Sequence, residues 1–249
     1  MGAQMVKAVR FVGISASPRK AANTQILVEE ALRAAEDLVR GCGCIAEVEV
    51  VSLAGRRILP CINCDQCIKQ GSYCVLRDDW LELARPLFDP VPNGVIFGSP
   101  VYFYNQNSIG RAYMERFTSV LKKLWDPAFP HDPPDWSTTA AGAVAVGFDR
   151  HGGVEMVLDS ILHWFLVLGF VVVGGFYTGG AAWTHMDAEK QAVKRDQLGL
   201  AAARLVGRRV AKTALLFQAG GEVLDVVRAV DTSWRSEAAA LLEGGERRE

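Results

Sequence analysis

Short apolar or alternating runs occur along the chain between longer segments in which apolar residues recur every three to four positions. The short runs are bounded by serine, proline or glycine, as is typical of strands in a buried sheet. They predict strands over residues 7–14, 46–53, 94–98, 140–146 and 170–173. The longer segments have helical spacing and predict helices over residues 26–38, 79–87, 108–124, 154–168 and 189–216. Asn23 and Thr24 are candidate caps of the first helix, and Gly41 is expected to end it.

The alternation of strands and helices predicts the fold class. Parallel strands need a long connection between them, which usually contains a helix, so strands that alternate with helices indicate parallel pairing. We therefore expect an α/β fold with a doubly wound sheet of five parallel strands and helices on both faces.

Two segments and the C-terminal tail fall outside this alternation. We expect one domain over residues 1–216, which includes a cysteine cluster at 61–74 and a Pro/Trp loop at 125–136, and then a helical extension over 217–249. The Pro/Trp loop holds four prolines and two tryptophans. Such a stiff excursion is expected to fold over a site or a neighbouring subunit and to contribute substrate specificity.

The composition narrows the possible partners and location. With 27 basic and 28 acidic residues the net charge is -1, so we expect no nucleic-acid partner. The most apolar stretch, residues 161–173, is too short for a membrane span and is interrupted by His163 and Gly169, so no membrane association is expected. Residues 1–10 lack the apolar core of a secretory signal, which predicts a cytoplasmic location where thiols stay reduced.

The turn after the first expected strand carries side chains that suit a phosphate group. Ser15, Ser17, Asn23 and Thr24 surround one strand-to-helix turn, and Arg19 lies beside them. Hydroxyl and amide donors, the free N–H groups of a helix start and a cation together favour a phosphate dianion. The pattern is neither a Walker loop nor a GxGxxG turn. An ordinary capped helix with solvated basic residues explains the same residue types equally well.

This segment resembles the phosphate loop of the flavodoxin-like NAD(P)H-dependent FMN reductases, whose motif is G-x-S-x-S-x-R-x-x-x-N-T. Residues 98–105 (GSPVYFYN) resemble the loop of that family that packs against the flavin ring, and residues 147–155 (GFDRHGGVE) resemble a third flavin loop. The resemblance covers roughly residues 7–212. It implies that FMN is bound by Ser15, Ser17, Arg19, Asn23, Thr24, Gln25, Pro100, Val101, Tyr102, Phe103, Asn105, Gly147, Gly152 and Gly153.

The residue types of these loops agree with a flavin site. The aromatic run from Tyr102 to Tyr104 offers flat apolar surface for a tricyclic ring, although alternation predicts that one of the three side chains points into the core. Gly152 and Gly153 allow a close approach of the backbone. All three loops follow expected strands, and ligands of open parallel sheets bind beyond the carboxyl ends of the strands.

Four of the six cysteines form a compact pattern. Cys61, Cys64, Cys67 and Cys74 follow the spacing C-x2-C-x2-C-x6-C, which lets successive thiolates converge on one inorganic centre. Four thiolates complete a [4Fe-4S] or [2Fe-2S] cluster. Zinc accepts four thiolates too, but its sites usually pair two C-x2-C knuckles across a longer gap. The spacing favours the [4Fe-4S] cluster over zinc, and buried free thiols are the remaining alternative.

The cysteine pattern resembles that of the iron-sulfur flavoproteins, a branch of the same superfamily that binds FMN and a [4Fe-4S] cluster. Its position between the second and third expected strands and the neighbouring Asp78-Asp79 agree with this branch. The resemblance implies that the four clustered cysteines bind the metal. Cys42 and Cys44 are expected to have no part in it.

These features together predict an FMN-dependent oxidoreductase that passes electrons between a [4Fe-4S] cluster, FMN and a small-molecule acceptor. A flavin exchanges a hydride or single electrons, whereas a cluster passes one electron at a time. The expected donor is NAD(P)H or ferredoxin. In the resembling family the cluster of one subunit lies near the FMN of another, so a homodimer or homotetramer is expected.

No catalytic side chain is expected, because the chemistry belongs to the cofactors. His151 is interpreted as a solvated loop residue and His163 as a core residue. Two alternatives stay open. One is an NAD(P)H-dependent FMN or quinone reductase without a functional cluster, and the other is a non-catalytic redox-sensing or zinc-binding module.

Overall fold

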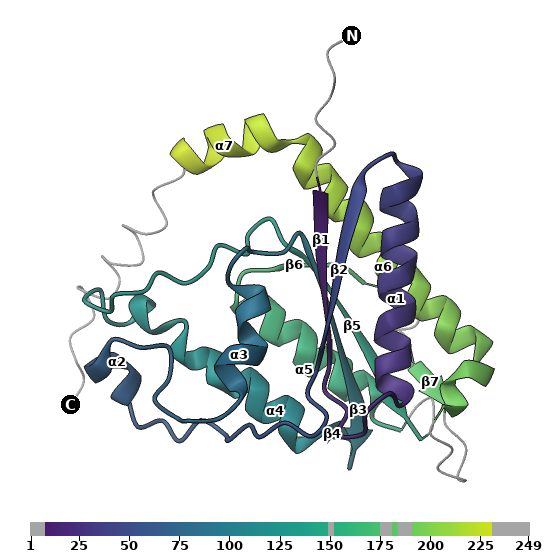
Figure 1. The fold of residues 1–249 in the computed structure, drawn as a ribbon, viewed down its shortest axis with the longest axis horizontal. Coiled ribbons are helices and arrows are strands. Elements are labelled where there is room, and N and C mark those ends of the chain that lie inside the picture. Colours follow the sequence, from purple (N-terminus) through teal and green to yellow (C-terminus); the bar gives the residue numbers. More distant parts are fainter. Residues whose placement is uncertain (1–7, 149–151, 175–180, 184–190, 231–249) are drawn as a thin grey trace.

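A computed structural model describes residues 8–148, 152–174, 181–183 and 191–230 of the chain (Figure 1). Its central sheet has the strand order β2-β1-β3-β5-β6, and all neighbours along this path are parallel. The order is that of the flavodoxin-like doubly wound sheets, so the predicted fold class is confirmed. The strands of this path are β1 (Ala8–Ser15), β2 (Ile45–Ser52), β3 (Gly94–Tyr102), β5 (Ala140–Gly147) and β6 (Val171–Val172).

Two further strands were not expected. β4 (Asn105–Gln106) pairs antiparallel with the end of β3, and β7 (Ala181–Trp183) pairs parallel with the end of β5. β6 pairs only with the first two residues of β5, so the expected fifth strand over 170–173 is shorter than predicted and β7 extends the same sheet edge. Strands of two or three residues are too short to give a periodic signal.

Helices cover both faces of the sheet, as Figure 1 shows. α1 and α6 pack on one face, with Val9 and Phe11 of β1 beneath them. α3, α4 and α5 pack on the other, over Ile14 of β1 and Phe97 of β3. The helices are α1 (Asn23–Gly41), α2 (Gln66–Gln70), α3 (Trp80–Ala84), α4 (Ser108–Glu115), α5 (Val154–Val167), α6 (Gln197–Ala219) and α7 (Gly221–Val230). Among the described residues, no helix is long and apolar enough to cross a membrane.

α1 and α6 approach each other closely because one position is glycine. A Cβ atom at Gly207 of α6 would overlap the backbone carbonyl of Ala31 in α1. A backbone carbonyl cannot move aside as a side chain can, so any larger residue at 207 would push the two helices apart. The start of α1 is thereby kept close to the chain segment that precedes α6.

Three predicted helices are interrupted. The expected helix over 79–87 is α3 followed by a 3₁₀ turn at Arg85–Leu87, where Pro86 lacks a backbone donor. The expected helix over 108–124 is α4 followed by 3₁₀ turns at Arg116–Ser119 and Lys122–Leu124, because Ser119 Oγ donates to the carbonyl of Arg116 and the next N–H groups bond three residues back. The expected helix over 189–216 begins later. A 3₁₀ turn spans Ala192–Arg195, and Asp196 then caps α6 by accepting from the N–H of Gly199 at 3.0 Å.

Two smaller expectations were wrong. Asn23 and Thr24 lie inside α1, whose N-cap is Ala22 without a side-chain bond. His163 is not a core residue, because it lies on the exposed face of α5 beside Asp159, with 3.2 Å between Nδ1 and Oδ1. The division of the chain at residues 216 and 217 stays a prediction. α6 runs on to residue 219, α7 follows it, and residues 231–249 lie outside the described part.

Candidate functional site

Three loops meet at the carboxyl edge of the sheet, after β1, β3 and β5. Asn107, which follows β4, donates from Nδ2 to the carbonyl of Ala16 in the first loop at 2.6 Å. The N–H of Ala16 in turn donates to the carbonyl of Gly98 in β3 at 2.8 Å. These two bonds hold the first loop against the second. The loops predicted to hold a flavin are therefore neighbours in the fold, at the edge where open parallel sheets bind ligands.

The loop between β1 and α1 contains a buried hydroxyl without a partner. Ser15 is fully buried, and within the described residues its Oγ makes no hydrogen bond. A buried polar atom left unpaired is costly, so such an atom at a ligand edge indicates that a ligand completes it.

The other side chains predicted to hold the phosphate lie in the same turn, and several bond to nearby groups. Ser17 Oγ accepts from the N–H of Arg19 at 3.2 Å and can still donate its own proton. Thr24 is buried and Arg19 is exposed. The amides are engaged: Asn23 Oδ1 accepts from the N–H of Val193 at 3.2 Å, and Gln25 Oε1 accepts from the N–H of Ala21 at 3.1 Å.

The loop after β3 is a tight hairpin into β4. Phe103 and Tyr104 both have positive φ, +47° and +62°, as the two central residues of a type I′ turn require. Phe103 is fully exposed, Tyr104 is 63% exposed and Tyr102 is 48% exposed. The expectation that one of these three aromatics points into the core was wrong, because the turn ends the alternation of β3 before Phe103. Of the other residues predicted for this loop, Pro100 and Val101 are half-buried and Asn105 is exposed.

The loop after β5 touches the tip of this hairpin. Gly153 has φ +93°, and a Cβ atom there would lie 2.6 Å from Cα of Tyr104. Only glycine combines that backbone conformation with that approach. Gly147 ends β5 and is buried, and Gly152 is half-buried. His151, between them, lies outside the described residues.

The residues present fit a flavin phosphate ester. Besides Ser15 Oγ, both polar atoms of the buried Gln106 side chain are without a partner in the described part of the chain. Gln106 lies in β4, two residues after the hairpin turn formed by Phe103 and Tyr104, called the aromatic turn below. Unpaired donors and acceptors next to flat exposed aromatics are what a ligand with a polar ring edge and an apolar ring face requires.

The four clustered cysteines line a single pocket. Asp65 and Gly71 flank α2 and both have left-handed backbones, which bend the loop around on itself. Cys67 in α2 is buried, Cys61 and Cys74 are half-buried, and Cys64 is exposed. All six cysteines of the chain are free thiols.

The donor set of this pocket suits a metal centre. No three or more His, Cys, Asp or Glu side chains in the described ranges are grouped closely enough to hold one metal ion. The four cysteines nevertheless border one pocket, and four thiolates are the donor set of a [4Fe-4S] cluster and also of a zinc site.

Basic side chains lie at the same pocket. Lys122 and Arg116 both line it, and Lys122 Nζ pairs with Asp65 Oδ1 at 2.6 Å. Burial disfavours the charge of Lys122, but the hydrogen bond from its Nζ to Asp65, together with the charges of Asp65, Cys67 and Cys61, outweighs this and raises its pKa, so it is a cation. Burial raises the pKa of the Cys67 thiol, and the charge of Lys122 offsets part of that rise.

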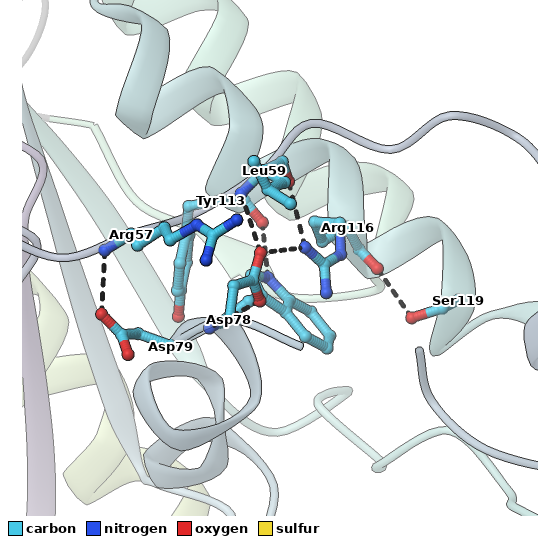
Figure 2. A network of polar contacts seen from close by, with 8 residues as sticks. Arg57, Leu59, Asp78, Asp79, Tyr113, Arg116 and Ser119 are labelled. Carbon is cyan, nitrogen blue, oxygen red and sulfur yellow. Dashed lines mark hydrogen bonds and ion pairs between the residues drawn. The ribbon is translucent and has the colours of Figure 1, made fainter. Parts of the chain in front are cut away.

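A buried ion pair closes the base of the cysteine loop (Figure 2). Arg116 Nη1 donates to Asp78 Oδ2 at 2.7 Å and to the carbonyl of Leu59 at 3.0 Å. Asp78 also accepts from the N–H groups of Leu59 and Trp80. Leu59 and Asp78 flank the cysteine segment in the sequence, so these bonds join its two ends.

The Pro/Trp loop packs against the cysteine loop. His131 Nε2 lies 2.9 Å from the carbonyl of Gly71, and its ring is tilted by 39° against that of Tyr73 with 4.9 Å between centroids. Pro130 lies close to Gly71: a Cβ atom added at Gly71 would be 2.9 Å from Cγ of Pro130. The loop therefore supports the cysteine segment. A role in substrate specificity stays a prediction.

Some residues of both sites carry no sequence motif. Asn107, Gln106 and Lys122 owe their positions to tertiary contacts, and no local pattern marks them. Arg116 had a signal that could have been followed. It lies three residues after Tyr113, on the apolar face of the segment, where an arginine needs a buried partner.

Comparison with known proteins assigns the family. The NADPH-dependent FMN reductase family matches residues 9–184. An iron-sulfur flavoprotein of Methanocaldococcus jannaschii is 34% identical over 213 residues, which is 84% of this chain and 100% of the relative. The chain belongs to the iron-sulfur flavoprotein branch of the FMN reductase family. Another iron-sulfur flavoprotein, from Archaeoglobus fulgidus, is 31% identical over 81% of this chain and 95% of its own.

Two solved structures have the same fold as this member of the iron-sulfur flavoprotein family. RosB with a bound 8-demethyl-8-formylriboflavin-5'-phosphate intermediate superposes with a TM-score of 0.64 at 15% identity, over 97% of this chain and 89% of RosB. A flavone reductase superposes with a TM-score of 0.55 at 16% identity, over 83% of this chain and 63% of the other. At such identities the likeness shows the fold alone. The family itself makes the chain an FMN-dependent redox flavoprotein and a flavin-dependent oxidoreductase.

Proposed function

We propose that this flavin-dependent oxidoreductase passes electrons between a [4Fe-4S] cluster held by Cys61, Cys64, Cys67 and Cys74, an FMN and a small acceptor. The pocket shared by the four thiols carries the proposal. FMN would supply exchange of a hydride or of single electrons, and the cluster exchange of one electron at a time. NAD(P)H or ferredoxin is the proposed donor.

The FMN phosphate is proposed to lie in the loop after β1. Ser15 Oγ and Ser17 Oγ would donate to it, and Arg19 would neutralise part of its charge at the surface. The amides of Asn23 and Gln25 shape this loop through the bonds described above. The flavin ring is proposed to lie against the aromatic turn, between the loop after β3, which ends at Asn105, and the loop after β5, which ends at Gly153.

We further propose that cluster and flavin meet across a homodimer or homotetramer interface. In one protomer the two candidate sites are apart, because α2 of the cysteine loop and α1 of the phosphate loop lie on opposite sides of the molecule (Figure 1). The aromatic turn exposes Tyr102, Phe103 and Tyr104, a surface that a neighbouring subunit would cover. The six free thiols favour a reducing compartment such as the cytoplasm.

Anaerobic purification followed by iron, sulfide, zinc and flavin analysis tests the proposal. We expect about four irons and one FMN per chain. A Cys64→Ser variant should lose most of the iron, whereas Cys42→Ser, the matched control outside the pocket, should keep it. Fewer than about two irons per chain after reconstitution with iron and sulfide would contradict the cluster. Stoichiometric zinc without a yellow chromophore would favour the zinc-binding module instead.

A reductase without a functional cluster is the second candidate, and the match to the NADPH-dependent FMN reductase family favours it. The Cys64→Ser variant separates the two. If anaerobic NADPH bleaches its flavin as fast as in the unmodified protein, and acceptor reduction continues unchanged, the cluster is dispensable and the second candidate holds. If acceptor reduction stops while FMN stays bound, the cluster is part of the electron path.

A further inference from the structure

Arg116 has a feature that its ion pair with Asp78 does not explain. Its side chain is only 1% exposed, and its Nε is a buried donor without a partner in the described part of the chain. A guanidinium offers five N–H donors, and leaving one buried and unpaired is costly. The bonds to Asp78 and Leu59 both use Nη1.

Two neighbours of Arg116 contact it without bonding to Nε. The guanidinium carbon lies over the Trp80 ring, 5.1 Å from its centroid. Ser119 Oγ donates to the Arg116 backbone carbonyl and takes no part in bonding the side chain (Figure 2). Arg116 also lines the pocket of the four cysteines. The side chain that carries the unpaired N–H therefore borders the pocket of the four cysteines.

We propose that Arg116 Nε donates a hydrogen bond to a sulfur of the cluster held in this pocket and thereby raises its reduction potential. The proposal rests on the proposed function, because it needs the cluster. A cluster becomes more negative when it accepts an electron, so a fixed donor stabilises the reduced form more than the oxidised form. Asp78 and Leu59 hold the Arg116 guanidinium in place.

A purely structural role for Arg116 predicts different behaviour. In that case Arg116 serves only to neutralise Asp78, and breaking the pair from either side should have the same effect. The proposed role predicts that the reduction potential falls in one variant and does not fall in the other. Arg116→Lys keeps a cation near Asp78 but removes Nε, whereas Asp78→Asn keeps Nε and removes a negative charge from beside the guanidinium.

The test is a spectroelectrochemical titration of the anaerobic holoproteins, with iron content and thermal midpoint measured alongside. For Arg116→Lys we expect the ratio of reduced to oxidised cluster, read at the wild-type midpoint, to fall about tenfold, which corresponds to about 59 mV for one electron. Asp78→Asn should leave that ratio unchanged or raise it, although both variants melt at lower temperature. Arg57→Lys, an exposed arginine near the same network, is the control and should match wild type.

A second measurement uses the wild-type holoprotein alone, so it does not require that a variant assembles its cluster. Wild-type holoprotein grown with ¹⁵N-labelled arginine should show a nitrogen coupling to the reduced cluster in pulsed electron paramagnetic resonance. A cluster-loaded wild type without that coupling, an Arg116→Lys ratio within twofold of wild type, or equal shifts in Arg116→Lys and Asp78→Asn would overturn the inference. A wild type that binds no iron would overturn the proposed function and this inference together, so the two failures are distinguishable.

Discussion

Arg116 and Asp78 form a buried ion pair with 2.7 Å between Nη1 and Oδ2, and their side chains are 1% and 0% exposed. The pair joins the 3₁₀ turn after α4 to the end of the cysteine segment. Asp78→Asn should therefore lower the free energy of unfolding by about 3 kcal/mol or more, because it leaves a buried guanidinium without its counter-charge. Urea denaturation at pH 7 measures this. Glu82→Gln, which breaks the exposed Arg56–Glu82 pair, is the matched control and should change stability by less than about 1 kcal/mol.

The same pair predicts a pH dependence. Burial alone would raise the pKa of Asp78, but the hydrogen bonds from Arg116, Leu59 and Trp80 outweigh it and hold the pKa below its ordinary value of 3.8. A carboxyl with a depressed pKa stabilises the fold above its unfolded pKa and loses that contribution as the pH falls through the folded pKa. The stability difference between wild type and Asp78→Asn should be constant from neutral pH down to about pH 5 and shrink below it. A difference that stays constant down to pH 2 would contradict the assignment.

Ser15→Ala tests the phosphate loop. Ser15 Oγ has no partner among the described residues, so its removal should leave the stability of the flavin-free protein unchanged or slightly higher. FMN affinity should fall by about tenfold or more, the loss expected for a hydrogen bond to a charged group. Fluorescence titration with FMN and thermal melts of the flavin-free protein measure the two effects. Ser52→Ala, at the position paired with Ser15 in the neighbouring strand β2, should keep full affinity.

Asn107→Ala tests the link between the first two loops. Loss of the buried bond to the Ala16 carbonyl should lower the free energy of unfolding by about 1–3 kcal/mol. FMN binding should weaken as well, because the phosphate loop loses its anchor. Asn93→Ala is the matched control, since the Asn93 side chain also bonds to the backbone, here by accepting at Oδ1 from the N–H of Arg10 at 2.9 Å, but at the opposite edge of the sheet. Equal losses of FMN affinity in both variants would contradict a specific role for Asn107.

The parts of the fold that could be predicted from the sequence are those with long repeating signals. β1, β2 and β5 are runs of eight residues whose ends were predicted to within one residue, and β3 begins at Gly94 as predicted but continues four residues beyond the expected end, to Tyr102. The segments in which the structure differs from the prediction depend on single hydrogen bonds, either between residues far apart in the sequence or from a side chain to the nearby backbone. Ser119 Oγ donates a hydrogen bond to the carbonyl of Arg116, and Asp196 caps α6. Two expected helices are therefore interrupted where the apolar periodicity alone would continue them.

The candidate site divides in the same way. The cysteine spacing and the phosphate-loop motif are local, so both could be recognised before the structure. Other features of the site depend on which groups already have partners. These are the hydroxyl of Ser15, which has no partner among the described residues, the bond from Asn107 to Ala16, and the buried ion pair of Arg116 at the base of the cysteine loop. That information exists only once the chain is folded, because burial and pairing are tertiary properties.

Gly153→Ala tests whether the loop after β5 must touch the aromatic turn. The substitution adds two costs: strain from the positive φ, and overlap with Cα of Tyr104. Gly169→Ala separates them, because Gly169 has φ +85° and no atom within 4 Å of an added Cβ, so it carries the strain alone. We expect Gly169→Ala to cost about 1 kcal/mol of stability and to keep FMN affinity. Gly153→Ala should cost more and lose FMN affinity, because Tyr104 and the turn must move to accommodate the methyl group. Urea denaturation and FMN titration of the two variants measure this, and equal behaviour would show that the contact with Tyr104 has no part in shaping the flavin site.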